Sequence, residues 1–183
     1  MPVTRVKLTY EEYFSLPEDT RPCELIDGEL YMPPAPISRH QRILINLLRA
    51  IDHFVREKNL GDVYISPVDV ILDRARPLIL QPDLLFVSQG RRHIIQERIE
   101  GAPDLVVEVL SPGSAIRDRT EKAVWYGQYG VREYWLVDPE TRTIEVRRLS
   151  TEGYETLGVY GPGQVFASEI LPGLVLPVDP LFA

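Results

Sequence analysis

The spacing of apolar residues predicts two helices in the first third of the chain. Ser38-Arg39-His40-Gln41 has the form of a capping box, and leucine, isoleucine and valine then recur three and four residues apart as far as Val55. This pattern predicts the longest helix of the protein, ending near Asn59-Leu60-Gly61. A second capping box, Thr9-Tyr10-Glu11-Glu12, predicts a short helix that reaches about Leu16 and is stopped by Pro17.

Short apolar runs between turn residues predict a series of β-strands. Residues 23–31 have a hairpin pattern around Asp27-Gly28, a dipeptide that tolerates the positive φ of a tight turn. The run at 104–110 is mostly apolar, which is typical of a strand buried on both faces. Further strands are expected at residues 62–66, 68–72, 84–87 and 132–138, with a final antiparallel pair at 143–149 and 154–160.

The remaining segments complete the predicted fold class. A helix is expected from about Ala115 to Tyr129, closed by Gly130, and the polar stretch at 88–101 has room for a helical turn. The tail from Gly161 is rich in proline and glycine and is expected to wrap over the surface. This order predicts an α/β (α+β) fold with a central mixed β-sheet flanked by helices, an N-terminal helix and hairpin, and a C-terminal β extension.

Length and composition favour a single domain. The 183 residues, 44% of them apolar, can form one sizeable core, which we divide into residues 1–37, a central part at 38–138 and a C-terminal extension and tail at 139–183. No apolar run approaches the roughly 18 residues that span a bilayer. The N-terminus lacks a signal-peptide pattern, and the single Cys23 cannot form an internal disulfide. We therefore expect a cytoplasmic protein that does not bind membranes.

The net charge limits how this chain could bind nucleic acid. A formal charge of −7 argues against a general binder of polyanions, so any such contact must come from a local basic face. The helix predicted after Ser38 offers one, because it carries five basic residues against two acidic ones between Arg39 and Lys58. His40 and Gln41 lie in its first turn, where an anion is favoured, and Arg39 and Arg42 are among its basic residues. An ordinary solvated helix face explains the same residues at least as well.

The first candidate functional residues of this sequence are acidic. There is no Gly-rich phosphate loop, no Gly-x-Ser-x-Gly elbow and no metal-ligand spacing among the histidines. Glu108 lies in the middle of an apolar strand, where an unpaired carboxylate is costly, so it should meet a cation or a metal unless it faces water at a strand edge or pairs with one arginine. Asp104 lies about 13 Å away along the strand and is too distant to share an ion with it. Asp83 opens another strand, and neighbouring strands are about 4.8 Å apart, so it can share an ion unless it is a turn residue after Pro82.

Lys122 is a stronger candidate than most lysines because only three of the 20 basic residues are lysine. It lies on the helix predicted after Glu108, in a largely apolar stripe, so its side chain can cross that stripe toward the sheet. The alternative is a solvated ion pair with Asp118, one turn earlier, worth a few tenths of a kcal/mol. The pattern alone leaves both interpretations open.

From Leu8 to about Leu149 the order and spacing of several segments are similar to those of a known family. The chain resembles the Uma-two family, restriction endonucleases of the PD-(D/E)XK nuclease superfamily. The segments that carry the resemblance are Leu8-Thr-Tyr-Glu-Glu-Tyr-Phe14, Glu24-Leu-Ile-Asp-Gly-Glu-Leu30, the His40 helix, Gln81-Pro-Asp-Leu-Leu-Phe-Val87, Pro103-Asp-Leu-Val-Val-Glu-Val-Leu-Ser-Pro112, Glu121-Lys122 and Tyr134-Trp-Leu-Val-Asp-Pro139.

The resemblance implies a restriction-endonuclease-like core and a metal-dependent DNA endonuclease that hydrolyses phosphodiester bonds. Asp83 and Glu108 would hold magnesium or manganese together with the backbone carbonyl of Val109, and Lys122 would assist. The superfamily pattern places lysine two residues after the acid, where this chain has Leu110. The resemblance therefore implies that the lysine has moved to the following helix, at Lys122.

Two further residues match positions of the family and are carried over as catalytic candidates, Glu24 and His40. The implied partner is DNA, with Arg39 and Arg42 as contacts, and a homodimer is expected because a duplex cut needs two sites. The alternative is a catalytically silent module that keeps the nuclease fold for binding or structure. A third possibility, a hydrolase for a small phosphorylated molecule, has no sequence support of its own.

Overall fold

The protein folds around two β-sheets, described here from a computed structural model in which residues 7–16, 23–33 and 35–183 are placed. The larger sheet has six strands in the order β11-β10-β9-β8-β6-β3. Its neighbours are antiparallel except for β8 and β9, which run parallel, so the predicted mixed sheet is confirmed. Its strands are β3 (Gly61–Ile65), β6 (Leu84–Ser88), β8 (Leu105–Val109), β9 (Glu133–Asp138), β10 (Thr143–Ser150) and β11 (Gly153–Tyr160).

The smaller sheet was not expected as a separate layer. It has five strands in the order β2-β1-β5-β4-β7, and it contains both the predicted hairpin and the strand predicted at 68–72. A turn in which Asp73 accepts hydrogen bonds from the N–H groups of Ala75 and Arg76 folds β4 back onto β5 and away from the larger sheet. Its strands are β1 (Glu24–Ile26), β2 (Glu29–Tyr31), β4 (Val70–Asp73), β5 (Leu78–Leu80) and β7 (Ile99–Glu100).

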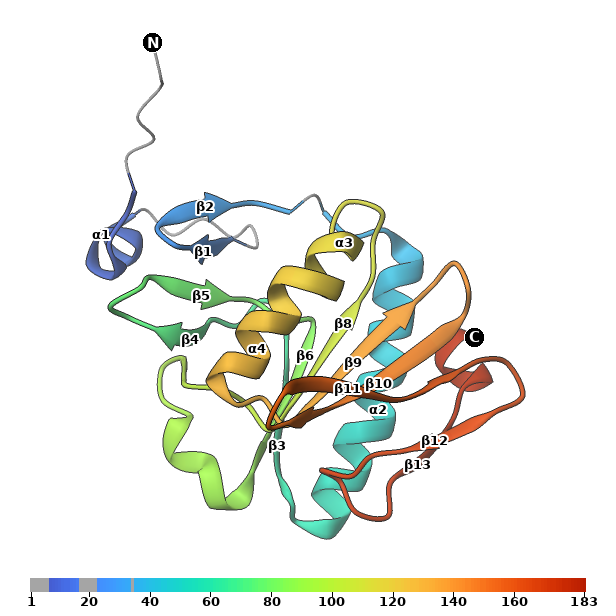
Figure 1. The fold of residues 1–183 in the computed structure, drawn as a ribbon. Coiled ribbons are helices and arrows are strands. Elements are labelled where there is room, and N and C mark those ends of the chain that lie inside the picture. The colour runs from blue at the N-terminus through green and yellow to red at the C-terminus, as the bar shows by residue number, and fades with distance from the viewer. Residues whose placement is uncertain (1–6, 17–22, 34) are drawn as a thin grey trace.

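Helices cover both faces of the larger sheet (Figure 1). α2 (Ser38–Lys58) buries its apolar stripe against one face, beside alternate strand residues such as Phe86, Val107 and Trp135. The other face packs against the helix after β8 and against the smaller sheet through residues such as Leu85 and Val106. The alternation of side chains along β8 places Glu108 on this second face.

The predicted helices are present, with different details at their ends. Thr9 caps α1 (Tyr10–Ser15) in the expected capping box, whereas Pro17, the expected stop, lies outside the described residues. The capping box predicted at Ser38 is wrong: α2 begins at Ser38 itself, its N-cap is Ile37, and no side chain caps it. α2 ends before Asn59, which adopts a left-handed conformation as expected for a helix stop.

The C-terminal tail does more than wrap over the surface. β12 (Val165–Ala167) and β13 (Val175–Pro177) form a hairpin, and a 3-10 helix follows at Asp179–Phe182. Phe166, Leu174 and Leu181 of this tail are buried in the core that α2 shares with the larger sheet. A 3-10 helix at Gln89–Ile94 supplies the turn expected in the polar stretch at 88–101. No helix in the described ranges is long and apolar enough to cross a bilayer.

Candidate active site

Asp83 and Glu108 lie opposite each other on two neighbouring strands. β6 and β8 are antiparallel, with Leu84 opposite Val107. Extending this register by one residue places Asp83, immediately before β6, opposite Glu108, a position where Cβ atoms are about 4.5–5.5 Å apart. Asp83 Oδ2 accepts a hydrogen bond from the Val109 N–H at 2.8 Å, which fixes the carboxylate beside the end of β8.

The helix that follows β8 contains a π-helical turn, and this turn carries the basic residue of the site. Ala115–Arg117 (α3) is α-helical, Asp118–Lys122 forms the π turn, and α4 (Ala123–Tyr129) completes the helix before Gly130. Asp118, Lys122 and Tyr126 are spaced four residues apart and are all buried against the sheet. Single π turns inside α-helices are frequent at functional sites.

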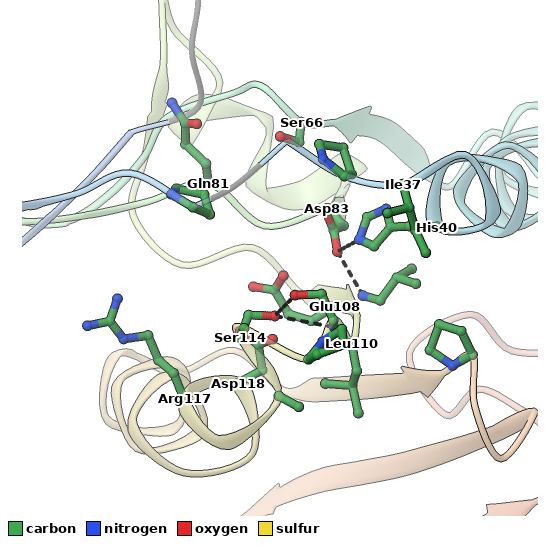
Figure 2. A pocket seen from close by; sticks show the side chains of 18 of the residues that line it. Ile37, His40, Ser66, Gln81, Asp83, Glu108, Leu110, Ser114, Arg117 and Asp118 are labelled. Carbon is green, nitrogen blue, oxygen red and sulfur yellow. Dashed lines mark hydrogen bonds and ion pairs between the residues drawn. The ribbon is translucent and has the colours of Figure 1, made fainter.

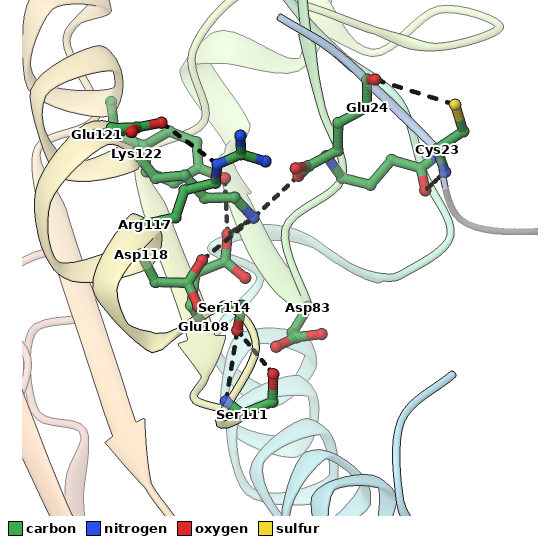
Figure 3. A network of polar contacts seen from close by, with 12 residues as sticks. Cys23, Glu24, Asp83, Glu108, Ser111, Ser114, Arg117, Asp118, Glu121 and Lys122 are labelled. Carbon is green, nitrogen blue, oxygen red and sulfur yellow. Dashed lines mark hydrogen bonds and ion pairs between the residues drawn. The ribbon is translucent and has the colours of Figure 1, made fainter. Parts of the chain in front are cut away.

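Three carboxylates surround the amine of Lys122 (Figure 3). Its Nζ lies 2.9 Å from Glu24 Oε1, 3.0 Å from Glu108 Oε1 and 3.5 Å from Asp118 Oδ1. The three acids and the lysine are only 2–6% exposed. Two further donors fix the two nearest carboxylates: the Tyr126 hydroxyl donates to Glu108 Oε1 at 2.9 Å, and the Gln81 N–H donates to Glu24 Oε1 at 3.1 Å.

Burial and mutual charge shift the pKa values of this cluster. Burial raises the pKa of Glu108 well above its usual value; the positive charge of Lys122 opposes that shift, and the negative charge of Asp118 adds to it. Burial likewise raises the pKa of Asp118, again against the effect of Lys122. Burial alone would lower the pKa of Lys122, but the surrounding carboxylates outweigh it and raise the pKa well above its usual value. Lys122 is therefore a cation at neutral pH.

His40 joins the site from the first turn of α2. Its Nε2 lies 3.2 Å from Asp83 Oδ2, and its side chain is buried. Burial alone would lower the pKa of His40, but the hydrogen bond to Asp83, the charge of Asp83 and the backbone of Val109 raise it. Asp83 is thus held by two donors on one oxygen, the Val109 N–H and His40.

These groups line one cavity of about 880 Å³ (Figure 2). Its lining includes Asp83, Glu108 and Lys122, the three residues that the resemblance implies for metal binding and catalysis. Glu24 and His40 also line it. Among the described residues, the wall also includes Tyr31, Pro33, residues 35–37, 66–67, 110–115 and 138–140, and Gln41, Gln81, Arg117 and Asp118. A concave pocket with converging buried polar groups is the usual form of an active site.

The two arginines predicted to contact DNA are placed differently from these groups. Arg39 donates hydrogen bonds to the Glu140 carboxylate at 3.0 Å and to the carbonyl of Pro139, and it is not among the residues that line the cavity. Arg42 is exposed on α2 outside the cavity lining. Arg39 is therefore engaged within its own chain.

The sequence analysis missed Asp118 and Tyr126 as members of the site. Asp118 appeared there only as a solvated partner of Lys122, but it is 2% exposed, and its Oδ1 has no hydrogen-bond partner among the described residues. Tyr126 lies in the same stripe of the helix, one turn after Lys122. The useful signal was the four-residue spacing of the three, which places them on one helix face.

The chemistry of the donors suits a small divalent cation, although no group of three or more His, Cys, Asp or Glu side chains in the described ranges forms a ready metal site. The hydrogen bonds of Asp83 use Oδ2, and those of Glu108 use Oε1. One carboxylate oxygen of each acid therefore remains for a ligand in the cavity. Magnesium prefers oxygen ligands and usually binds through one or two carboxylates plus substrate phosphates, so two free oxygens match its needs.

Comparison with known proteins supports the class of fold. The chain is similar to the crystal structure of a "putative nuclease belonging to DUF820" from Anabaena variabilis, with a TM-score of 0.81 and 22% sequence identity, covering 96% of this chain and 97% of that chain. The mixed sheet with helices on both faces is therefore the fold of that protein as well.

The family is shown by a second comparison. A family model described as "Putative restriction endonuclease" matches residues 10–179, and the chain belongs to this family, Uma-two. The resemblance found in the sequence is thereby confirmed. No curated protein matches the chain.

Proposed function

We propose that this protein is a magnesium-dependent endonuclease that hydrolyses phosphodiester bonds of DNA. The observation that carries the proposal is the convergence of Asp83, Glu108 and Lys122, from two strands and a helix, on one cavity. The family and the fold are those of restriction-endonuclease-like nucleases, which supports a hydrolase reaction of this kind.

In this proposal Asp83 and Glu108 hold the metal through the oxygens that their hydrogen bonds leave available, with the backbone carbonyl of Val109 as a third ligand. Manganese is expected to replace magnesium. A bound divalent ion polarises the phosphate and lowers the pKa of a water molecule. His40 and the Val109 N–H keep the Asp83 carboxylate turned toward the cavity.

Lys122 supplies a fixed positive charge next to the reacting phosphate. Its amine donates to Glu108 and Glu24 in the resting site, and a cation in this position stabilises negative charge that develops on phosphorus oxygens. Glu24 also contacts the amine of Lys122, at 2.9 Å. Tyr126 donates to Glu108 and orients the same carboxylate.

We further propose that the protein acts on DNA as a homodimer, because cutting both strands of a duplex needs two sites. The net charge of −7 means that local groups, with the bound ion, must neutralise phosphates. Arg42, exposed on α2, is the remaining candidate for such a contact among the two arginines singled out by the sequence.

Plasmid cleavage tests the proposal. Wild-type protein with magnesium or manganese should nick or linearise plasmid, and Glu108→Ala should not. Glu57→Ala, which removes an exposed glutamate of α2 remote from the cavity lining, is the matched control and should cleave normally. The alternative, a silent module with a nuclease fold, is supported instead if purified wild-type protein leaves DNA intact with either metal.

Metal binding is tested separately by calorimetric titration with manganese. Asp83→Asn and Glu108→Gln should each weaken the binding, because each replaces an anionic ligand by a neutral amide. Glu57→Gln should bind as the wild type does. Normal binding by both site variants would show that the metal ligands lie elsewhere.

A further inference from the structure

The cavity wall beside the carboxylates is largely apolar. Proline and aliphatic side chains line it from three segments: Pro33, Pro36 and Ile37 before α2, Leu110 and Pro112 after β8, and Pro139 after β9. Phosphate groups gain nothing from such a wall, whereas a flat nucleobase buries its faces against one. The wall therefore fits a substrate that carries an apolar, planar group next to its phosphodiester.

The hydrolytic groups lie too deep for an intact duplex. Glu108 is 4% exposed and Lys122 is 6% exposed. Duplex DNA is stiff, and bending a site of 20–30 base pairs costs about 1–6 kcal/mol before any strand enters a pocket. A single strand bends freely and can present one nucleotide to the floor of the cavity.

The charges around the cavity also favour a single strand over a duplex. Its lining contains six carboxylates, namely Glu24, Asp83, Glu108, Asp118, Asp138 and Glu140, against the cations Arg117 and Lys122 and the imidazole of His40. Two of the acids, Asp138 and Glu140, flank Pro139, and Arg39 is tied to Glu140. Duplex binding relies on many Lys and Arg contacts to phosphates. Among the described residues, this mouth offers few.

An arginine stacked on a tyrosine stands at the side of the cavity. The Arg117 guanidinium lies 3.7 Å from the centre of the Tyr31 ring, and both residues line the cavity. Its Nε is 3.3 Å from Glu121, while its Nη1 is buried and has no hydrogen-bond partner among the described residues. Unpaired bases commonly stack on aromatic rings and on arginine planes, so this pair offers a stacking surface beside the cavity.

We propose that the cavity binds one unstacked nucleotide of a single-stranded nucleic acid. The base lies against the proline and isoleucine wall beside the Arg117–Tyr31 pair, and the adjoining phosphodiester reaches Asp83 and Glu108. This inference rests on the proposed nuclease function and narrows its substrate to single strands or to duplexes with unpaired segments.

Cleavage of matched substrates tests the inference. One labelled oligonucleotide is offered alone, annealed to its full complement, and annealed to a strand that leaves a central unpaired bubble, each with magnesium or manganese. The single strand and the bubble should be cut at least roughly tenfold faster than the full duplex, since opening the duplex costs stacking and pairing. Equal or faster cutting of the full duplex overturns the inference and leaves the nuclease proposal standing.

Binding without cleavage separates the two proposals. Binding is measured by fluorescence anisotropy with calcium in place of magnesium or manganese. Tyr31→Ala should weaken binding of the single strand by roughly five- to a hundredfold, the usual effect of removing a stacking ring. Arg117→Lys, which keeps the charge but loses the planar group, should also weaken it. Tyr10→Ala is the matched control, because Tyr10 stacks on Arg74 at 4.7 Å outside the cavity.

Each remaining outcome has a definite meaning. If no substrate is cut but the strand binds with the expected dependence on Tyr31 and Arg117, the nuclease proposal fails and the binding site stands. If both Tyr31→Ala and Arg117→Lys bind as the wild type does, or if a mononucleotide binds as tightly as the strand, the inference of a single-strand site is wrong.

Discussion

Replacing Lys122 by methionine should destabilise the protein strongly, because the amine is the cation that three buried carboxylates share. Glu24, Glu108 and Asp118 are 2%, 4% and 2% exposed, so solvent cannot compensate for the loss. At an effective dielectric constant of about 20, charges about 3 Å apart attract by roughly 5–6 kcal/mol, and desolvation cancels much of this gain. Removing one partner of such a buried pair typically costs about 3–5 kcal/mol. For a chain of this size that cost lowers Tm by roughly 6–20 °C.

The pH dependence gives the prediction its sharpest form. The charge of Lys122 lowers the pKa values of Glu108 and Asp118, which burial has raised, so both pKa values should rise further in Lys122→Met. A carboxyl group whose pKa is higher in the folded than in the unfolded state loses stability as pH rises between those two values. The deficit of the variant should therefore be largest at neutral pH and above, and should shrink in mild acid.

Urea denaturation of both proteins across this pH range measures the effect. Lys58→Met is the control, because Lys58 is 54% exposed and its ion pair with Glu57 is long, at 3.6 Å. The free energy of unfolding of this variant should differ from that of the wild type by less than about 0.5 kcal/mol. The double variant Lys122→Met/Glu108→Gln should regain part of the loss, since it removes one of the stranded charges. A small deficit that does not vary with pH would refute the idea of a shared buried cation.

Three further predictions concern other buried acids. Asp118→Asn should lower the cleavage rate while leaving manganese affinity close to that of the wild type, because Asp118 contacts Lys122 and not the proposed metal ligands; an equal loss of metal affinity in calorimetry would contradict this. Asp104 accepts hydrogen bonds from Ser88 N–H at 2.7 Å and from Arg132 at 2.6 Å. Burial alone would raise the pKa of Asp104, but these contacts lower it. Asp104→Asn should therefore reduce the free energy of unfolding, measured by urea denaturation, by about 1.5–3 kcal/mol at neutral pH. The reduction should become smaller as pH falls through the lowered pKa. Glu133 is fully buried and binds the tail through Ser168, so Glu133→Leu should speed proteolytic removal of residues 161–183, and an unchanged digestion pattern would refute that anchoring role.

Much of the site could be predicted because it depends on strand geometry. Glu108 lies in an apolar strand, and that context predicted a cation or a metal beside it unless it faced water or paired with one arginine. The pairing of β6 with β8 brings Asp83 beside it, as the spacing of neighbouring strands allowed. Lys122 was found through its rarity and its apolar surroundings, and its side chain does cross to the sheet.

Other features could not be predicted because they depend on contacts between distant segments. The local pattern makes Glu24 a surface residue of a hairpin, and only the family resemblance singled it out. Its burial beside Lys122 results from the packing of the smaller sheet against the helix after β8. β5 has three residues, too few to show a period, so the smaller sheet was not recognised. The π turn at Asp118–Lys122 leaves no signature in apolar spacing, and Asp118 therefore appeared solvated.

The negative charge of the cavity supports the proposal that it binds a divalent cation. Among the groups that line the cavity, the four acids Glu24, Asp83, Glu108 and Asp118 and the ammonium group of Lys122 carry a formal charge of −4 + 1 = −3 with every carboxyl ionised; Asp138, Glu140, Arg117 and His40 also line the cavity and are left out of this count. Buried charges are normally paired or bound to metal, and an excess of this size is not stable in a poorly solvated cavity. Burial raises the pKa values of Glu108 and Asp118, which favours their protonated forms and so a smaller negative charge. A divalent ion would leave −3 + 2 = −1 and make those protons unnecessary. We therefore expect the cost of placing Asp83 and Glu108 in this cavity to favour binding of a divalent ion between them.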